Sequence, residues 1–506
     1  MSDRLLNLPF ETSGEWYLLE NPSNKIAGSL NYSPERTELH LLESFKPLRG
    51  PIRFGETDQA YPVVHGITRE GEAMTLLNAQ RARWYIKFGT GGLRQPELLV
   101  SSLLVIGAHL PPDFSYPEMS FRVPGLQIWL SRQIIEQTIE QDEIVGTTTN
   151  SYNIRGMTKE KNWIPSINAN LEWAYSWQSN CDGFTSIAVA VSAWLTIRPN
   201  DPQTAEWYFK QLGKISTMLA FLAGSPMSPD CIKASIGEEY QDVYIMVALH
   251  NAKYCSYTNL DDFFMSKGEM GVDLTDVVVR WFELYPKLHM PSQLALSVLA
   301  SEKLWLHVEF LSLMQALEGF HRALFVGYYM SEDEYESVKK ALGDAIPTEL
   351  SSDHKDALRS RIRYGNQISL RKRLDELAGS LPEQIRKVIL GFDRTTPRSW
   401  IDTRNYYTHW DEELRSNMLD SQGMFNAHVR LRHFLRVLYL NLMGIPQEAI
   451  LKSLQNASNS SQHLAQLNLK ERPDDKENMS GVVMVVQEKI TGDGDHQENE
   501  TGSPKE

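Results

Sequence analysis

The fold of the second half of the chain is decided by one stretch, residues 306–324, which reads LHVEFLSLMQALEGFHRAL. Its large apolar side chains recur at steps of four and three residues: Leu306, Phe310, Leu313, Leu317, Phe320 and Leu324. This spacing predicts a helix with one continuous apolar stripe, because an α-helix turns once in about 3.6 residues. A second apolar face is formed by Leu304, Val308 and Leu311. We therefore expect this helix at the centre of a bundle.

The helical period extends on both sides of this stretch, from about residue 291 to residue 457. The predicted helices are Glu332–Leu342, Asp353–Leu377, Pro382–Leu390, Ser399–Leu419 and Ala427–Leu442. Gly444-Ile445-Pro446 ends the last of these, and a short helix follows to about Leu454. The sequence thus predicts an all-α helical bundle over residues 291–457.

The residues before 291 have the period of strands. Apolar and polar side chains alternate from Asn170 to Trp177, which is typical of a half-buried strand. The other predicted strands are Lys25–Tyr32, Thr37–Leu42, Thr185–Ile197 (a central strand), Cys231–Ile236 and Val243–His250. One helix interrupts them, with Asp201 as its cap, Pro202 in its first turn and Gly224 past its end. Many short strands separated by Pro, Gly and Asn indicate a sandwich- or barrel-like β-rich domain over residues 1–290.

Composition sets the remaining limits. The 506 residues contain 50 Lys and Arg against 64 Asp and Glu, a formal charge of −14, which argues against a surface that is basic throughout. Residues 458–506 are polar and acidic, and we expect them to form a disordered tail. Three cysteines without a Cys-x-x-Cys pattern indicate reduced thiols and a cytoplasmic protein. No segment is predicted to be a signal peptide or to enter a membrane.

Most catalytic motifs are absent from the sequence. The glycine-rich Gly89-Thr-Gly-Gly92 lacks the Gly-Lys-Ser/Thr of a phosphate-binding loop, so we interpret it as a turn. His307 and His321 lie on one helix among core positions, and His428 and His433 have no carboxylate close by in sequence. The first pair is interpreted as packed or surface residues, and neither pair as metal ligands. We expect neither a metal nor a cofactor.

One cluster of polar residues stands apart: Asp402-Thr-Arg404-Asn405-Tyr-Tyr-Thr-His409-Trp410, near the start of a predicted helix. Asn405 and His409 are four residues apart and share a helix face, so the amide could orient the imidazole. Arg404 lies about 140° around the helix from His409. The two side chains can border one cleft but cannot hold one atom from an isolated helix. A second copy approaching across a two-fold axis would supply the missing partner.

These residue types suit RNA cleavage. RNA carries its own nucleophile, the 2′-OH beside each phosphate. Histidine can move the protons, and arginine can stabilise the charge that develops on the phosphate, so no metal is needed. The neighbouring helices are rich in arginine, among them Arg373, Arg430 and Arg436. The simpler interpretation is that these arginines line solvated helix faces, that Arg404 pairs with Asp402 or Glu412, and that His409 is a capping or surface residue.

Three stretches of the second half resemble the HEPN domains of ApeA-type bacterial anti-phage proteins: Leu317–Arg322, Tyr364–Leu374 and Thr403–Trp410. HEPN nucleases use an Arg-x4–6-His motif with a polar residue directly after the arginine. Arg404, Asn405 and His409 occupy these places and are our candidate catalytic residues. The first half is similar to the N-terminal domain of such proteins through its size and the Gly28–Leu30 strand, and the resemblance covers roughly residues 10–455.

The resemblance implies a metal-independent endoribonuclease that cleaves RNA, such as tRNA, and acts in abortive infection. It also implies a homo-oligomer, either a dimer or a dimer of dimers. The first half would then be a sensor or an assembly domain, and the expected trigger is a phage-encoded protein. The alternative is a non-catalytic HEPN module that binds RNA or a nucleotide, with a protein-interaction β-domain. A carbohydrate-binding β-domain is a third interpretation, which the strand-like alternation of Trp173 and Trp177 disfavours.

Overall fold

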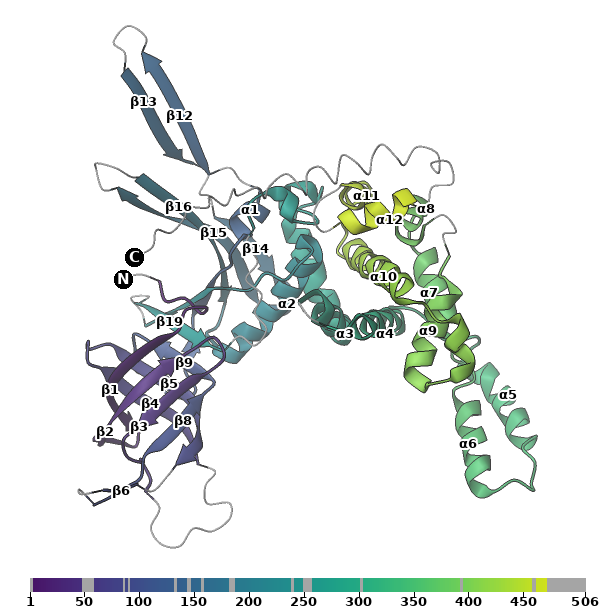
Figure 1. Cartoon of the computed structure of the whole chain (residues 1–506), viewed down its shortest axis with the longest axis horizontal. Coiled ribbons are helices and arrows are strands. Elements are labelled where there is room, and N and C mark those ends of the chain that lie inside the picture. Colours follow the sequence, from purple (N-terminus) through teal and green to yellow (C-terminus); the bar gives the residue numbers. More distant parts are fainter. Residues whose placement is uncertain are drawn as a thin grey trace, which may run out of the picture.

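The computed structural model describes residues 3–47, 59–84, 87–89, 92–131, 134–142, 147–155, 159–181, 187–237, 241–248, 257–300, 304–391, 395–456 and 461–470. Its first half is β-rich and its second half is helical, as the sequence predicts (Figure 1). All pairings within its main sheet are antiparallel.

A β-barrel forms the start of the chain, because strand β5 pairs with β8 as well as with β4 and so closes a ring. The strands follow the order β5-β4-β1-β2-β3-β8 around it. Their bounds are β1 (Phe10–Leu18), β2 (Asn21–Tyr32), β3 (Thr37–Leu41), β4 (Ala60–Thr68), β5 (Ala73–Trp84) and β8 (Glu97–Ser101). The Trp16 side chain is buried and packs so closely on Gly66 that a Cβ there would lie 2.2 Å from its ring. The barrel confirms the predicted architecture.

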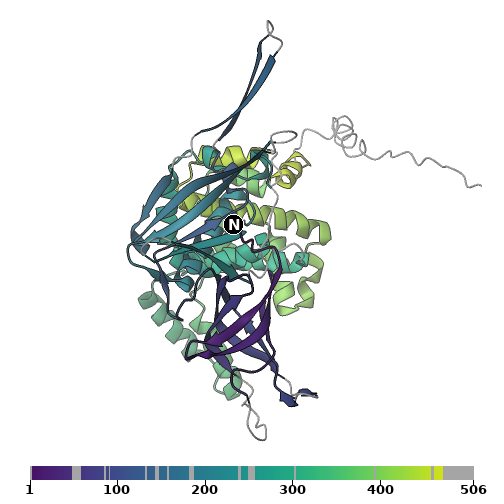
Figure 2. The ribbon, with the colours of Figure 1, turned by 90° about the vertical axis from the view of Figure 1, so that its left-hand side faces the viewer.

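The same sheet continues from β5 into an open half, which has the order β9-β19-β18-β11-β16-β15-β14. The bounds are β9 (Leu103–Ile106), β19 (Gln241–Val247), β18 (Cys231–Ile236), β11 (Glu118–Arg122), β16 (Ile187–Pro199), β15 (Ala169–Cys181) and β14 (Glu160–Ile164). Small pairs lie beside it: β6 (Lys87–Gly89) with β7 (Gly92–Arg94), β10 (Ser115–Tyr116) with β17 (Gln203–Thr204), and β12 (Ile135–Asp142) with β13 (Thr147–Ile154). Figure 2 shows β12 and β13 as an arm that projects away from the sheet.

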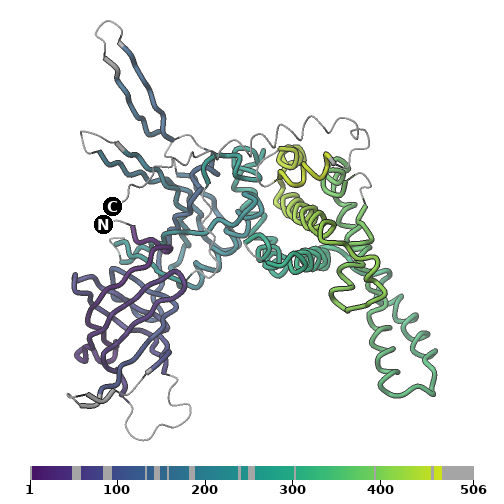
Figure 3. The backbone as a smooth tube through the Cα atoms, viewed as in Figure 1, coloured from purple at the N-terminus to yellow at the C-terminus, as the bar shows by residue number. Residues whose placement is uncertain are grey.

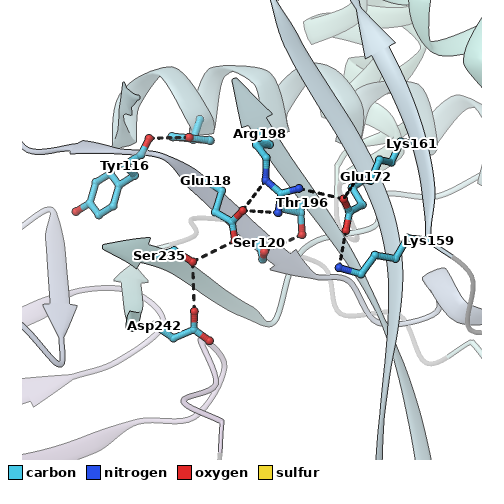
Figure 4. A network of polar contacts seen from close by, with 11 residues as sticks. Tyr116, Glu118, Ser120, Lys159, Lys161, Glu172, Thr196, Arg198, Ser235 and Asp242 are labelled. Carbon is cyan, nitrogen blue, oxygen red and sulfur yellow. Dashed lines mark hydrogen bonds and ion pairs between the residues drawn. The ribbon is translucent and has the colours of Figure 1, made fainter. Parts of the chain in front are cut away.

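A network of polar side chains covers part of the open sheet (Figure 4). Arg198 donates from Nε to Glu118 (2.7 Å) and from Nη1 to Glu172 (3.2 Å). Burial acts to raise the pKa of Glu172, but the hydrogen bond from Lys159 and the nearby cations outweigh it and lower the pKa. Since every cation in this network faces a carboxylate, we interpret it as a clamp between strands.

The helical half is built around α4 (Leu306–Leu324), which packs against α3, α7 and α10 as predicted for a central helix. The remaining bounds are α1 (Leu126–Trp129), α2 (Ala205–Ala223), α3 (Leu274–Ala300), α5 (Glu332–Asp344), α6 (Ser352–Arg363), α7 (Leu370–Gly379), α8 (Glu383–Leu390), α9 (Arg398–His409), α10 (Ser421–Leu442), α11 (Gln447–Gln455) and α12 (Gln462–Lys470). Figure 3 shows α5 and α6 as a hairpin that extends from the end of this bundle.

Two predicted helices are shorter in the structure. The helix expected over Asp353–Leu377 is two helices, α6 and α7, because Ser369 caps a new start by accepting a hydrogen bond from the Lys372 N–H. The helix expected over Ser399–Leu419 ends at His409, because Trp410 takes a left-handed conformation with φ of 53°. The cluster that the sequence placed near the start of a helix therefore lies in its second half.

Helix α3 begins well before the predicted change of period, and it spans residue 290, where we placed the domain boundary. Its internal Pro286 and Pro291 argue against a helix by local rules, since proline lacks the N–H donor. Burial of Trp281 and Phe282 on one side of the helix compensates for those losses. Helix α2 also differs at its start, where Thr204 rather than Asp201 is the cap, while Gly224 ends it with φ of 94° as expected.

The tail prediction needs one correction. Residues 461–470 belong to the segment predicted to be disordered, yet they contain α12, which packs on α8, α10 and α11 with Leu464 fully buried. Residues 471–506 lie outside the described part of the chain, as do residues 90–91 of the glycine-rich turn, residues 249–250 of a predicted strand and Cys255. No helix among the described residues is long and apolar enough to cross a membrane.

The two halves share one hydrophobic core. At their junction the ring of Phe221 on α2 stacks on Tyr439 of α10, with 4.0 Å between centroids. Tyr439 also forms a hydrogen bond of 2.9 Å with Ser292 of α3 and contacts the Phe320 ring on α4 edge-on. This aromatic junction therefore fixes the bundle against the β-domain.

We predict that Phe221→Ala lowers the stability of both halves together, by about 3–5 kcal/mol, because the cavity opens within the shared core. Thermal unfolding followed by circular dichroism in the helix and strand regions will measure this. Trp177→Ala is the control, since that side chain is 49% exposed, and we expect a change within about 0.5 kcal/mol. An unchanged helical transition in Phe221→Ala would show that the halves unfold independently.

Candidate functional site

The candidate site lies on the second half of α9, on the side that faces α4. Arg404 donates from Nη2 to Glu318 Oε2 of α4 (3.4 Å) and from Nη1 to Asn405 Oδ1 (3.1 Å). Its side chain is 28% exposed, so the guanidinium is held in place and still reaches solvent. The partner of Arg404 is thus neither Asp402, which pairs with Arg398, nor Glu412, as the simpler interpretation supposed.

Glu318 connects Arg404 to a second arginine. Its Oε1 accepts hydrogen bonds from Nε (3.1 Å) and Nη2 (3.0 Å) of Arg322, one turn further along α4. The remaining arm of Arg322 donates from Nη1 to Gln367 Oε1 (3.1 Å), just before α7. A single carboxylate therefore lies between two cations.

A buried hydrogen-bonded pair, His321 and Arg373, lies below the surface formed by Glu318 and Arg322. His321 is fully buried, and its Nδ1 accepts a hydrogen bond from Arg373 Nη1 at 3.0 Å. Its Nε2 therefore carries the proton and donates to Glu376 at 2.7 Å. Burial lowers the pKa of Arg373, and the charge of Arg322 lowers it further. His321 is thus the packed residue that the sequence suggested as one alternative, and it holds α4 against α7.

His409 is the last residue of α9, and its side chain is exposed. The structure places it on the same helix as Arg404, although no hydrogen bond joins it to Asn405 or to any other residue that the structure describes. The Asn405 amide, which we expected to orient the imidazole, is bound by Arg404 instead. The three candidate residues therefore form an Arg–Asn pair and a separate, solvent-facing histidine.

Packing of the α9 surface sets the position of this helix. Tyr407 stacks on His307 of α4, with 5.5 Å between ring centroids and 10° between planes. Thr403 is fully buried, and its hydroxyl accepts a hydrogen bond of 2.8 Å from the Leu419 N–H. This bond fastens the segment that follows His409 back onto the helix.

The remaining histidines do not build a metal site. Within the described ranges, no group of three or more His, Cys, Asp and Glu side chains could hold a metal ion. His428 Nδ1 lies 3.4 Å from Glu309, and burial, reinforced by the charge of Arg432, lowers the pKa of His428 to about 4. The imidazole is therefore neutral near pH 7, and we interpret it as part of the core.

Several basic residues that might have bound RNA are buried instead. Arg373, Arg430 and Arg436 are each at most 5% exposed, so they do not line solvated helix faces. Arg436 donates from Nη2 to the Gly224 carbonyl at the end of α2 (2.9 Å), and its guanidinium lies 4.7 Å from the Phe264 ring centroid. These arginines hold elements together.

Sequence reasoning gave no role to Glu318 and Arg322, although both lie in the Leu317–Arg322 stretch. Their four-residue spacing is the signal of a pair on one helix face. Their contact with Arg404 joins residues that are 86 positions apart, and local spacing carries no information about it.

Residues 311–449, an all-α bundle whose helix α9 carries the Arg404-Asn405-x3-His409 sequence, match the family model Apea-like HEPN. Residues 11–281 match the model ApeA N-terminal domain 1, which alone spans more than half of the chain. The chain therefore belongs to the ApeA family and consists of an ApeA N-terminal domain followed by an ApeA-like HEPN domain. Comparisons with curated proteins and with solved structures gave no match. The family supports the interpretation of the chain as a HEPN-based anti-phage effector.

We predict that Thr403→Val destabilises the protein by about 0.5–1.5 kcal/mol, because the partly buried Leu419 N–H loses its acceptor. Hydrogen exchange at Leu419 and thermal unfolding will measure the change. Thr403→Ser keeps the hydroxyl and should retain the slow exchange of this amide. Equal exchange rates in the Val and Ser variants would contradict a role for the hydrogen bond.

Proposed function

We propose that this chain is a cytoplasmic, metal-independent endoribonuclease whose HEPN domain cleaves RNA, including tRNA, to stop phage growth by abortive infection. The observation that carries the proposal is the placement of Arg404. Its guanidinium is held by Asn405 and Glu318 and yet reaches solvent, on the helix that ends in the exposed His409. A cation beside a proton carrier is what cleavage through the 2′-OH requires.

The proposed reaction is a transfer within the RNA. The 2′-oxygen attacks the adjacent phosphorus while the bond from phosphorus to the 5′-oxygen breaks. His409 takes part in moving the proton from the 2′-OH or to the departing 5′-oxygen. Arg404 binds the phosphate oxygens as charge builds up, since guanidinium forms paired hydrogen bonds with phosphate. Asn405 has a positioning role, because its amide oxygen accepts from Arg404.

Glu318 is the group that the phosphate would displace. In the free protein its carboxylate neutralises part of the charge of Arg404 at 3.4 Å. Arg322 offers this carboxylate a second partner, at 3.0 Å. Phosphate binding to Arg404 would therefore leave Glu318 paired with Arg322, and no buried charge would lose its partner.

We infer that the complete site needs two copies of the chain. Arg404 reaches toward α4 and His409 toward solvent, so one helix does not bring both onto one phosphate. A symmetric homodimer, alone or as a dimer of dimers, would place two α9 helices on one RNA strand. The ApeA N-terminal domain would then regulate this pairing in response to a phage-encoded trigger protein, and the aromatic junction at Tyr439 gives it a rigid connection to the bundle.

The alternative function is a HEPN module that binds RNA or a nucleotide without cleaving it, with the β-domain as a protein-interaction module. The pairing of Arg404 with Glu318 is compatible with it, since a partly neutralised arginine can bind RNA without completing catalysis. The two functions predict different outcomes of incubation with RNA: a nuclease shortens the RNA, whereas a binding module leaves its length unchanged.

We predict that Arg404→Ala and His409→Ala each reduce cleavage of total cellular RNA by about 100-fold or more, and remove phage protection, while the fold is kept. Gel analysis of the RNA and plaque counts will measure both effects. Arg398→Ala is the matched control on the same helix, because its side chain is 76% exposed and forms a long ion pair of 3.6 Å with Asp402. Full cleavage by a folded His409→Ala protein would refute the proposed mechanism.

A separate prediction concerns the products. Cleavage should continue in excess EDTA and leave a 2′,3′-cyclic phosphate and a 5′-hydroxyl, because the 2′-OH replaces a metal-activated water. End-labelling with and without phosphatase treatment distinguishes these ends. Fragments with a 3′-hydroxyl and a 5′-phosphate would mean that another nucleophile acts.

A further inference from the structure

A short crossing of two segments lies beside the candidate site, at the base of the α5–α6 hairpin (Figure 1). The Ile368 N–H donates to the Gly327 carbonyl (3.1 Å), and the Tyr329 N–H donates to the Asn366 carbonyl (2.9 Å). The Asn366 side chain adds bonds to the N–H (3.1 Å) and the carbonyl (2.9 Å) of Met330. These bonds hold residues 327–330 and 366–368 against each other as a small antiparallel clamp.

The clamp decides which way its tyrosines face. Tyr328 pairs with Gln367 in an antiparallel bridge, and residues directly opposite each other in such a bridge point to the same face. The Gln367 side chain binds Arg322, which shares Glu318 with Arg404. Tyr328 therefore lies on the face of the candidate site. Tyr328 also lies near Arg373: its Coulombic effect acts to raise the pKa of Arg373, as that of Glu318 does. This proximity supports the placement of Tyr328.

Tyr329 lies on the opposite face, because successive side chains of an extended segment alternate. Its ring is covered by Lys372, whose Nζ lies 4.5 Å from the ring centroid. The two tyrosines are almost equally exposed, at 58% and 54%. The chain thus offers two neighbouring aromatic side chains that differ mainly in the face to which they belong.

The exposed ring of Tyr328 has the surroundings of a base-stacking residue. Arg322 lies on the same face, and 48% of its side chain is exposed. Arg322 pairs with Glu318, which in turn pairs with Arg404. Aromatic rings beside cations bind unpaired bases through stacking while the cations contact phosphates. An apolar protein partner would gain little from the half-exposed Arg322 and the partly exposed Arg404, whereas RNA can use a ring that lies beside cations, so we take RNA as the occupant.

We propose that Tyr328 forms a subsite for an unpaired nucleotide next to the phosphate held by Arg404, and that Arg322 lies beside this subsite as a cation that stays paired with Glu318. The substrate class is therefore RNA with single-stranded nucleotides at the cleavage site, such as a loop. This inference rests on the proposed function, because it places the subsite relative to Arg404. Tyr328 acts as a positioning residue that contacts a base and takes no part in proton transfer.

The test measures binding separately from cleavage. The probe is a fluorescein-labelled 12-nucleotide 2′-O-methyl oligoadenylate, which lacks the free 2′-OH and cannot be cleaved by the proposed reaction. Fluorescence anisotropy with the full chain gives its dissociation constant. Tyr328→Ala should weaken binding about tenfold, because the base loses its stacking partner, whereas Tyr328→Phe keeps the ring and should bind as the wild type does.

Tyr329→Ala is the matched control and should leave the dissociation constant unchanged. A 12-base-pair duplex of the same length should bind no more weakly to Tyr328→Ala than to the wild type, because paired bases are not available for stacking. Cleavage of cellular RNA by Tyr328→Ala should show a raised KM with little change in kcat.

Three results would overturn the inference: equal binding by Tyr328→Ala and wild type, equal losses in Tyr328→Ala and Tyr329→Ala, or a loss of self-association in Tyr328→Ala that accounts for weaker binding. The last would mean that a second copy covers this tyrosine, and size-exclusion chromatography detects it. The proposed function fails by a different result, cleavage that survives His409→Ala. The binding difference between the two tyrosines does not depend on cleavage.

Discussion

The stack of Phe221 on Tyr439 is the contact on which the arrangement of the two halves depends. Tyr439 lies near the end of α10, Phe221 near the end of α2, and Ser292 of α3 binds the Tyr439 hydroxyl. Three helices from both halves thus meet at one buried ring. Helix α3 also packs against α4, the helix that carries Glu318, so the junction and the candidate site belong to one group of packed helices.

Charged side chains have different structural roles in different parts of the molecule. On the open sheet, Arg198 and its neighbours are matched by carboxylates, and in the core Arg436 closes the end of α2. Near α9, by contrast, Arg404 and Arg322 share one carboxylate, that of Glu318.

Part of the candidate site follows from local sequence, because a helix fixes the relative directions of side chains that are four or five positions apart. Arg404, Asn405 and His409 could be chosen for that reason. The preference of Asn405 for Arg404 could not be foreseen, since neighbouring side chains compete for the same amide. The end of α9 directly after His409 depends on the left-handed Trp410, and a tryptophan carries no sequence signal for that conformation.

The sequence by itself determined the class of each half. Apolar residues recur about every two positions in a strand and every 3.6 positions in a helix, so their spacing indicates which element forms and which face is apolar. It also determined the central position of α4 and the ends of several strands. Only the tertiary structure decided that α3 tolerates two prolines, that residues 461–470 fold back as α12, and that Arg373, Arg430 and Arg436 are buried. It also decided the pairing of Glu318 with Arg404 and the opposite faces of Tyr328 and Tyr329. These features depend on contacts between residues far apart in the chain. The free energies of such contacts come from packing and burial, and they produce no periodic pattern in the sequence.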